Sequence, residues 1–397
     1  MFPRAERKQF DLKRAKSAVD GIFLASEAKC TGLDVSEARQ SIYIGFALML
    51  IREHVALAPY TTLGVGGPAR FLAEATSEAE VMEAVEFARS RQLPLFVLGG
   101  GSNLAVADAG FPGFVLKIGI AGVSQVNASD ETVIYEAGAG EDWDAFVARA
   151  VGENCAGLEC LSGIPGTVGG TPVQNVGAYG QEVSQRLREV RVLDLQTLQV
   201  RTLSNAECGF AYRSSIFNTT ERNRYIILNV AFELRKSGKP TLGYADLQIF
   251  FAQHVGDPTL AEVRAAVREI RHRKAMLIVP GDEDARSVGS FFKNPVVAQS
   301  VFEELSARLK TRGLQVPSYP ASNGFRKLPA AWLVEQAGFA KGYNRGPAGI
   351  SRRHALAIVN RGGATAADIM ALKDEIQSGV AAAFGIGLQP EPVFVGF

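Results

Sequence analysis

Two glycine-rich stretches constrain the fold of this chain more than any other feature of its sequence. The first, Gly99–Asn103, directly follows an apolar run over Leu93–Leu98, which predicts a buried β-strand. A strand that runs into such a loop can present backbone N–H groups to a phosphate. The second stretch extends over Gly163–Gly180. Glycine costs about 0.5–1 kcal/mol relative to alanine in an ordered element, so a folded domain concentrates it where the backbone takes a positive φ or touches a ligand.

Two explanations of these stretches remain open on this evidence: successive tight turns, or close approach of the backbone to a flat, phosphorylated cofactor. Neither stretch fits the G-x-x-x-x-G-K-[ST] pattern of a P-loop, and neither opens a helix with the dinucleotide fingerprint G-x-G-x-x-G. The segment Gly64–Gly67 comes closest, but its flanks do not match. Two separate loops suit a cofactor with a pyrophosphate at one end and a bulky ring at the other.

The composition allows two or three domains and favours a small ligand. The 397 residues include 42 Lys plus Arg against 41 Asp plus Glu, so no polyanion-binding character follows and we expect no nucleic-acid partner. A few converging cations could still bind a phosphorylated small molecule. The cysteines form no C-x-x-C pair and the histidines are dispersed, so we expect free thiols in a reducing cytoplasm and no metal site.

The N-terminal residues differ from the rest of the chain because they lack its motifs. Residues 1–54 carry no recognisable motif, and we treat them as an N-terminal extension of unknown role. They show no signal peptide, because no apolar core with a cleavage site follows the basic start directly. The apolar run Ile42–Ile51 is far shorter than the roughly twenty residues of a membrane helix. We expect a buried or fraying helix there and no membrane insertion.

Hydrophobic periodicity predicts alternating strands and helices in the remainder. The expected helices are Ser77–Gln92, Asp142–Asn154, Thr259–Arg273, Pro329–Ala337 and Ala366–Phe384. Further strands are expected at Phe114–Ile118, Thr132–Ala137, Glu189–Asp194, Tyr225–Leu234, Ala355–Asn360 and Val393–Phe397. A linker is expected near Lys236–Pro240.

Three side chains stand out as candidates for chemistry. Ser290 lies between Gly289 and the aromatic pair Phe291-Phe292. A hydroxyl in such surroundings is costly to desolvate, so it is either hydrogen-bonded structurally or used on a substrate. Arg213 lies in an Ala-Tyr-Arg-Ser cluster, and Glu391 comes six residues before the end of the chain.

Five segments, read in chain order, carry a specific resemblance: PYTTLGVGGPA (59–69), PLFVLGGGSNL (94–104), GLECLSGIPGTVGG (157–170), AYRSSIF (211–217) and GSFFKNP (289–295). This order resembles the UDP-N-acetylenolpyruvoylglucosamine reductases, the flavoenzymes called MurB, from about Ala58 to the C-terminus. The resemblance implies an α+β fold. A two-lobed FAD-binding domain of the vanillyl-alcohol-oxidase (PCMH) type would occupy residues 55–237, and a smaller α/β substrate-binding domain residues 238–397. The last strand would return near the flavin.

The resemblance also implies the cofactor and its contacts. FAD would be bound non-covalently, since no His or Cys lies within Gly99–Asn103. The first loop would hold the pyrophosphate, and the second would pass along the ribityl chain and the ring. The residues implied are Gly99, Gly100, Gly101, Ser102, Asn103, Gly163, Ile164, Pro165, Gly169, Gly170, Gly177, Ala178, Tyr179 and Gly180.

The reaction implied is the NADPH-dependent reduction of UDP-N-acetylglucosamine-enolpyruvate to UDP-N-acetylmuramate, a precursor of peptidoglycan. Hydride from flavin N5 adds to the terminal carbon, so negative charge develops on the neighbouring carbon and its carboxylate. Arg213 would bind that carboxylate and polarise the double bond, although a surface ion pair is its ordinary alternative. Glu391 could assist only in its protonated form, since a second carboxylate would repel the substrate. Ser290 would donate the proton.

For the nucleotide and the rest of the substrate, the resemblance implies the tyrosine-loop subclass. Tyr244 would close over the nucleotide, although it could also be a core tyrosine. Lys274 and Asn294 would contact the diphosphate, with Tyr212 and, more weakly, Gln336 as further candidates. The basic run Arg271–Lys274 has a plainer explanation, because cations are favoured at a helix C-terminus. NADPH and the substrate would occupy one pocket in turn, and we expect a monomer.

Two other functions are compatible with part of these features. An FAD-dependent oxidase or dehydrogenase of a hydroxy acid or sugar lactone would share the glycine loops but would not need Ser290 and Glu391. A nucleotide-binding module without activity would keep the loops and lose the chemistry. The joint presence of Arg213, Ser290 and Glu391 argues against both.

Overall fold

The computed structural model describes residues 49–397, apart from the side chains of residues 126–128. Most of the extension 1–54 and of the helix expected over Ile42–Ile51 therefore lies outside the described residues. The last three residues of that run, Met49–Ile51, are not helical. Along residues 49–397, no helix has both the length and the apolar character needed to cross a membrane.

A four-stranded sheet forms the first lobe, in the order β1-β2-β5-β3. Its strands are β1 (Arg52–Ala56), β2 (Pro68–Ala75), β5 (Phe111–Ile118) and β3 (Leu95–Leu98). The pairing of β1 with β2 is antiparallel, whereas β2–β5 and β5–β3 are parallel. Helix α2 (Glu78–Ser90) packs on this sheet. It begins where the Ser77 hydroxyl accepts a hydrogen bond from the N–H of Glu80, which confirms the predicted helix and its cap.

The strand that leads into the first glycine loop is mostly not buried, contrary to our expectation of a buried strand over Leu93–Leu98. It begins at Leu95 and lies at the edge of the sheet, and only Leu98 is buried. The physical reason is that the strand pairs only with β5, so its other side is uncovered by the sheet, and Pro94 directly before it has no N–H to donate. A short apolar run cannot distinguish an edge strand from a central one. The edge position leaves the following loop accessible from the side.

A six-stranded antiparallel sheet forms the second lobe, in the order β12-β11-β13-β7-β6, with β8 paired to β13. Its elements are β6 (Val123–Ala128), β7 (Thr132–Gly138), α3 (Trp143–Gly152), β8 (Cys155–Ala156), β11 (Leu187–Asp194), β12 (Gln199–Ser204) and β13 (Tyr225–Lys236). The fully buried Trp143 of α3 packs against Phe232 of β13. Its indole N–H donates to the carbonyl of Leu161 at 3.0 Å, which fixes the chain just before the second glycine stretch.

The C-terminal half is a separate core of helices and two small antiparallel sheets. Its helices are α6 (Gln299–Lys310), α7 (Ala330–Gln336) and α8 (Ala366–Phe384). Helices α4 (Ala245–Phe250) and α5 (Leu260–Arg273) do not belong to this core, because they pack with Cys160 against the second lobe. The sheets are β14 (Val296–Ala298), β16 (Phe325–Lys327) and β15 (Tyr319–Pro320), and β17 (Asn344–Arg345), β18 (Ala348–Ile350) and β19 (Ile358–Asn360). The helices expected at α5, α7 and α8 are confirmed, whereas α4 and α6 were not predicted.

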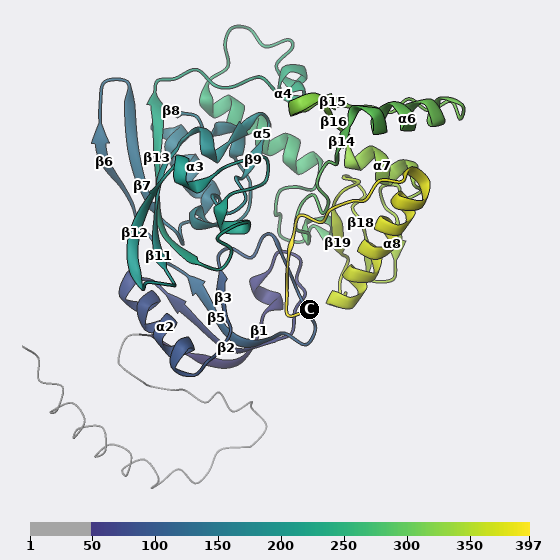
Figure 1. The fold of residues 1–397 in the computed structure, drawn as a ribbon. Helices are drawn as coiled ribbons and strands as arrows, with labels where there is room; N and C mark the ends of the chain where they lie inside the picture. Colours follow the sequence, from purple (N-terminus) through teal and green to yellow (C-terminus); the bar gives the residue numbers. More distant parts are fainter. Residues whose placement is uncertain (1–48) are drawn as a thin grey trace, which may run out of the picture. The chain divides into compact units, whose positions relative to one another are not determined.

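The end of the chain returns to the first lobe. Strand β20 (Val393–Val395) pairs in parallel with β4 (Leu104–Val106), which directly follows the first glycine loop. Figure 1 shows this yellow segment running back beside the N-terminal strands. The pairing brings Glu391 next to the first glycine loop, from which it is separated by almost 290 residues in sequence.

Candidate active site

The first glycine loop presents a row of backbone donors. Within the described part of the chain, no acceptor takes a hydrogen bond from the N–H groups of Gly99–Asn103. Gly101 has a φ of +65°, and a side chain there would overlap the carbonyl oxygen of Tyr60, so only glycine fits. Consecutive unpaired N–H groups in a tight loop form an anion-binding concavity.

The second glycine stretch packs directly on the first. A Cβ atom on Gly100 would lie 2.5 Å from the Cα of Gly166, and one on Gly166 would lie 2.9 Å from the Oγ of Ser102. Some of these glycines are therefore needed because the two loops pack closely on each other. Neither tight turns nor a bound cofactor, the two explanations given above, accounts for this contact. Beside this contact, the Thr167 hydroxyl is buried and has no hydrogen-bond partner in the described residues. An orphaned hydroxyl next to unpaired N–H groups fits a diphosphate ligand.

Arg213 and Glu391 meet in this structure. Their Nε and Oε1 atoms lie 3.2 Å apart, with side chains 24% and 11% exposed. Arg213 sits in a tight turn closed by two hydrogen bonds between Ala211 and Ser214, and its φ is +53°. A left-handed conformation at a non-glycine residue is strained and persists only where the surroundings enforce it. The turn thus fixes the direction of the guanidinium.

Ser290 lies on a strip of chain that runs alongside Glu391. The N–H of Glu391 donates to the carbonyl of Phe291 at 2.9 Å, and Lys293 donates to Gln389 at 2.9 Å. Phe291 and Phe292 are buried and anchor the strip, as expected from the motif. Ser290 itself is half-buried, and no described residue forms a hydrogen bond with its hydroxyl. The hydroxyl is therefore held by its neighbours and remains available to a ligand.

Asn103 joins three parts of the site. Its Nδ2 atom donates to the Oε1 of Gln174 at 2.9 Å and to the carbonyl of Glu391 at 3.3 Å. Its own carbonyl accepts from Val393 at 2.9 Å. One side chain thus connects the first loop, the second stretch and the C-terminal segment, so the groups of the site share a single framework.

Tyr212 and Asn294 line the same side as Arg213. The Tyr212 ring is 46% exposed, and the Nζ of Lys327 lies 5.0 Å from its centre. Partial burial raises the pKa of the Tyr212 hydroxyl, which also hydrogen-bonds Asn294. The Oδ1 of Asn294 accepts from the N–H of Ala330 and so caps α7. We did not identify Lys327 from the sequence, because the strand pairing that places it is non-local.

The expected nucleotide contacts form a second group around α4. Tyr244 is 43% exposed and packs edge-to-face on Tyr179, with ring centres 5.4 Å apart. It is therefore not a core tyrosine, the alternative that we left open. Lys274 ends α5 and pairs with Asp246 in α4. Desolvation raises the pKa of Tyr179 to about 12 and also raises that of Tyr244.

A buried polar cluster holds the chain just before Tyr244. The carboxylate of Glu159, which is fully buried, accepts from the N–H of Thr241 at 2.9 Å and from Gln181 at 2.8 Å. Gln181 also donates to the Thr241 hydroxyl at 3.2 Å, and the Cys160 thiol donates to the Thr241 carbonyl at 3.3 Å. Thr241 is thus fixed at every polar atom that it offers.

Two further residues were missed as site candidates. Arg271 is partly buried and donates to the carbonyls of Gly163 and Met276 at 3.1 and 2.6 Å, so it supports the second stretch rather than the helix dipole. Burial lowers the pKa of this guanidinium. Burial and then the charges of Lys274, Lys341 and Arg271 lower the pKa of His354 to about 4, so this imidazole is neutral at pH 7.

One candidate is not brought to the others. Gln336 is the last residue of α7 and is exposed. No hydrogen bond or ion pair in the described residues joins it to Arg213, Ser290 or Glu391.

Comparisons with known proteins agree with this arrangement. Residues 281–395 match the family model of the C-terminal domain of UDP-N-acetylenolpyruvoylglucosamine reductase, and residues 69–203 match that of an FAD-binding domain. The chain is 48% identical over 350 residues to the UDP-N-acetylenolpyruvoylglucosamine reductase of Thermobifida fusca, covering 87% of this chain and 98% of the relative. The Streptomyces avermitilis enzyme of that name is 45% identical over 346 residues, covering 86% and 93%. The crystal structure of the Thermus caldophilus reductase (MurB) superposes with a TM-score of 0.60 at 26% identity, covering 88% of this chain and all of that one.

Proposed function

This chain belongs to the UDP-N-acetylenolpyruvoylglucosamine reductase family, and from that premise we propose that it reduces UDP-N-acetylglucosamine-enolpyruvate to UDP-N-acetylmuramate with NADPH. It is an FAD-containing oxidoreductase with a two-lobed FAD-binding domain and a C-terminal domain of the family type. The observation that carries the proposal is the convergence of Arg213, Glu391 and the Ser290 strip beside the first glycine loop.

The cofactor site has the groups that a dinucleotide diphosphate needs. The unpaired N–H groups of Gly99–Asn103 and the Thr167 hydroxyl would hold the diphosphate, while Gly163–Gly180 would line the rest of the cofactor. Bound FAD supplies the hydride that the reaction requires. The chain itself must bind the enolpyruvyl group, stabilise negative charge and deliver a proton.

The three side chains divide this work by their chemistry. Addition of hydride to the terminal carbon leaves the electron pair of the double bond on the neighbouring carbon and its carboxylate. The planar guanidinium of Arg213 can bind that carboxylate through two N–H groups. Glu391, once protonated, can donate a hydrogen bond to the same group instead of repelling it. Ser290 would give its proton to the carbanionic carbon and be reprotonated from solvent.

The remaining assignments follow from the same premise. Tyr244, Lys274 and Asn294 would bind the uridine diphosphate, with Tyr212 beside the enolpyruvyl group. NADPH would use the pocket before the enolpyruvyl sugar does, in a ping-pong sequence. We also infer that the enzyme works as a monomer in the cytoplasm, where the buried thiols of Cys155, Cys160 and Cys208 would stay reduced.

The two half-reactions separate this function from its nearest alternative, an FAD-dependent oxidase of a hydroxy acid or lactone. We expect Ser290→Ala to leave reduction of the flavin by NADPH nearly unchanged and to slow reoxidation by the enolpyruvyl sugar by about a thousandfold. Stopped-flow absorbance of the flavin measures both steps. The exposed Ser300→Ala in α6 is the matched control. Equal losses in both half-reactions would show that Ser290 is structural, and reoxidation by oxygen but not by the enolpyruvyl sugar would favour the oxidase.

A further inference from the structure

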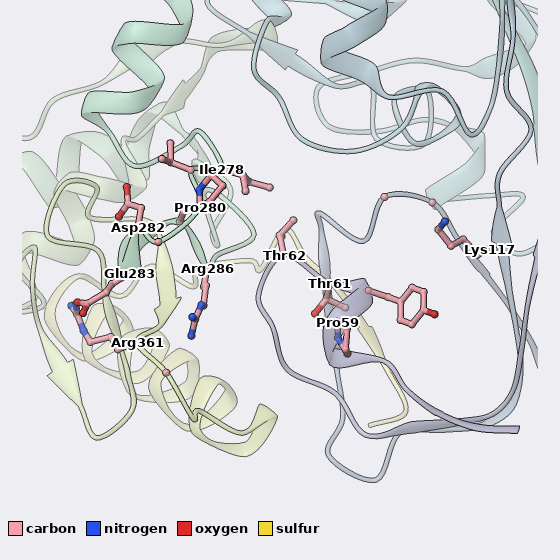
Figure 2. Close-up of a pocket in the computed structure, with 17 residues that line it drawn as sticks. Pro59, Thr61, Thr62, Lys117, Ile278, Pro280, Asp282, Glu283, Arg286 and Arg361 are labelled. Carbon is pink, nitrogen blue, oxygen red and sulfur yellow. The ribbon is translucent and has the colours of Figure 1, made fainter. Parts of the chain in front are cut away.

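A cavity of about 820 Å³ lies beside the first glycine loop, outside the group formed by Arg213, Ser290 and Glu391. One wall consists of Thr61, Thr62, Gly99 and Gly100. The opposite wall is a segment of the C-terminal half, Ile278–Arg286, which we call the strap. Figure 2 shows the strap residues facing Pro59, Thr61 and Thr62 across the cavity. Its volume is in the range of pockets that bind nucleotides and other small ligands.

The strap is held firmly by the C-terminal half. Asp284 is buried, and its Oδ2 accepts from the Ser351 hydroxyl at 3.1 Å and from the N–H of Arg352 at 3.0 Å. Asp282 pairs with Arg353. Just past the strap, the carbonyl of Ser287 accepts from the Thr62 hydroxyl at 2.6 Å, which ties this segment to the first lobe. The strap is therefore a fixed wall.

The charges that line the cavity balance, except for one. Lys117 pairs with Glu74 at 2.6 Å, Arg361 with Asp284 at 3.5 Å, and Glu283 with Arg352 at 3.4 Å. Asp282 is already paired, as described above.

Arg286 is the exception. No ion pair involves it within residues 49–397, and its side chain is exposed toward the cavity. Its backbone carbonyl accepts from the N–H of Asn360 at 3.0 Å, so the base of the side chain is fixed while the guanidinium is free. One uncompensated positive charge therefore faces the cavity.

The opposite wall adds donors of the same kind. The N–H groups of Gly99 and Gly100 line the cavity and have no acceptor among the described residues. A guanidinium on one wall and unpaired N–H groups on the other favour a ligand with a phosphate group. Each wall also contributes an apolar residue, Ile278 from the strap and Pro59 from the facing side, which could contact a sugar or a base.

With the diphosphate of FAD held by the first glycine loop, as proposed above, we propose that Arg286, from the C-terminal domain, contacts that diphosphate directly from the opposite wall of the cavity. The inference rests on the proposed function, since it requires that the chain binds FAD. The proposal gives the C-terminal domain a role in cofactor binding, because its strap lies against the part of FAD that takes no part in hydride transfer. Binding of FAD then ties the two halves of the chain together.

The test compares flavins that differ only in this half. Full-length Arg286→Gln and wild-type protein are freed of flavin and titrated with FAD and with riboflavin, following flavin fluorescence. We expect Arg286→Gln to weaken FAD binding about tenfold, because a charge-assisted hydrogen bond is lost, and to leave riboflavin binding unchanged. The loss should shrink at high salt. Arg312→Gln, an exposed arginine after α6 that lies outside the cavity lining, is the control and should bind both flavins as the wild type does.

The other possible outcomes would each contradict either the Arg286 contact or the proposed function. Equal FAD affinity in wild type and Arg286→Gln would overturn the proposal, and so would an equal loss for FAD and riboflavin, which would mark a structural effect. Inorganic phosphate or ADP that binds the wild type without competing with FAD would place the phosphate ligand elsewhere and would also overturn it. A wild-type protein that binds no flavin would instead defeat the proposed function. A thermal unfolding midpoint shared by the flavin-free variants checks their folding.

Discussion

The candidate active site has two regions that are built differently. The catalytic region, Arg213 with the Ser290 strip and Glu391, is fixed by backbone hydrogen bonds and by the buried Phe291 and Phe292. The proposed nucleotide region, Tyr244 with Lys274 and Asp246, lies where the start of α4 meets the end of α5 through a side-chain ion pair, and Tyr244 is 43% exposed. Groups that must meet developing charge need fixed positions, whereas groups that admit and release a nucleotide need freedom to move.

This contrast predicts that even a conservative change in the catalytic region is costly. Arg213→Lys keeps the charge but loses the planar pair of donors, so we expect kcat for the enolpyruvyl sugar to fall by about a hundredfold. Reduction of the flavin by NADPH should change little. Steady-state and stopped-flow rates give both values.

A matched variant makes this result specific. Arg222 is exposed and lies in the turn after the same segment, so Arg222→Lys should be neutral. If Arg213→Lys kept the wild-type kcat, bidentate binding of the carboxylate would be ruled out, and Arg213 would be no more than an ion-pair partner of Glu391.

The sequence predicted the local parts of this site well and the non-local parts poorly. Helices α5 and α8 were predicted from hydrophobic periodicity, and the structure adds a capping box at the start of each, Thr259 with Glu262 and Thr365 with Asp368. Hydrophobic periodicity and capping residues are both local patterns, so they can be recognised without knowing which segments meet in the fold. The strand β3 was misjudged because its edge position depends on which strands pair with β5, and no local pattern records that.

The same limit applies to the functional residues. The roles of Arg213, Ser290 and Glu391 came from a family resemblance. No local pattern in the sequence predicts that the C-terminal segment lies against residues 289–293. Arg271 read as a cation at a helix end, because its true partners are the backbone carbonyls of Gly163 and Met276. His354 gave no signal, since its lowered pKa depends on burial and on Lys274 and Lys341 nearby.

His354 offers a test of the nucleotide region through stability. Its pKa of about 4 lies below the ordinary value of 6.5, so the unfolded chain binds a proton between these pH values and the folded chain does not. The stability that His354 contributes is therefore present above pH 6.5 and is lost as the pH falls toward 4. Over that window we expect the wild type to lose up to about 3 kcal/mol more unfolding free energy than His354→Gln. Urea denaturation at several pH values measures the difference.

A second histidine provides the opposite control. The carbonyl of Gly256 and the carboxylate of Glu262 raise the pKa of His254, so its contribution has the reverse sign. The stability that it provides should be present at low pH and be lost as the pH rises through its folded pKa. Identical pH dependence in wild type and His354→Gln would mean that the imidazole is protonated freely in the folded protein.

Because Tyr244 is partly exposed and lies outside the catalytic region, we expect its variants to weaken substrate binding moderately and to change the chemical step little. Tyr244→Leu removes the ring that packs on Tyr179, and we expect KM for the enolpyruvyl sugar to rise about tenfold at nearly constant kcat. Tyr244→Phe keeps the ring and should restore most of the affinity. Ile249→Ala, on the exposed face of α4, is the matched control. A fall in kcat equal to the rise in KM would contradict the separation of the two regions.

The smallest effect is expected where the proposed nucleotide region joins the buried polar cluster, at Thr241. Its hydroxyl receives a hydrogen bond from Gln181, and its backbone is held by Glu159 and Cys160, so Thr241→Val removes one bond of the cluster and leaves the others. A lost hydrogen bond of about 1 kcal/mol corresponds to a severalfold rise in KM, with kcat unchanged. Thr241→Ser restores the hydroxyl and should restore KM. Because Val255 lies almost fully exposed beyond this anchor, limited proteolysis should also cut Thr241→Val faster there. If KM and the cleavage rate both stayed at wild-type values, the buried cluster would serve the fold alone and would not help to position Tyr244.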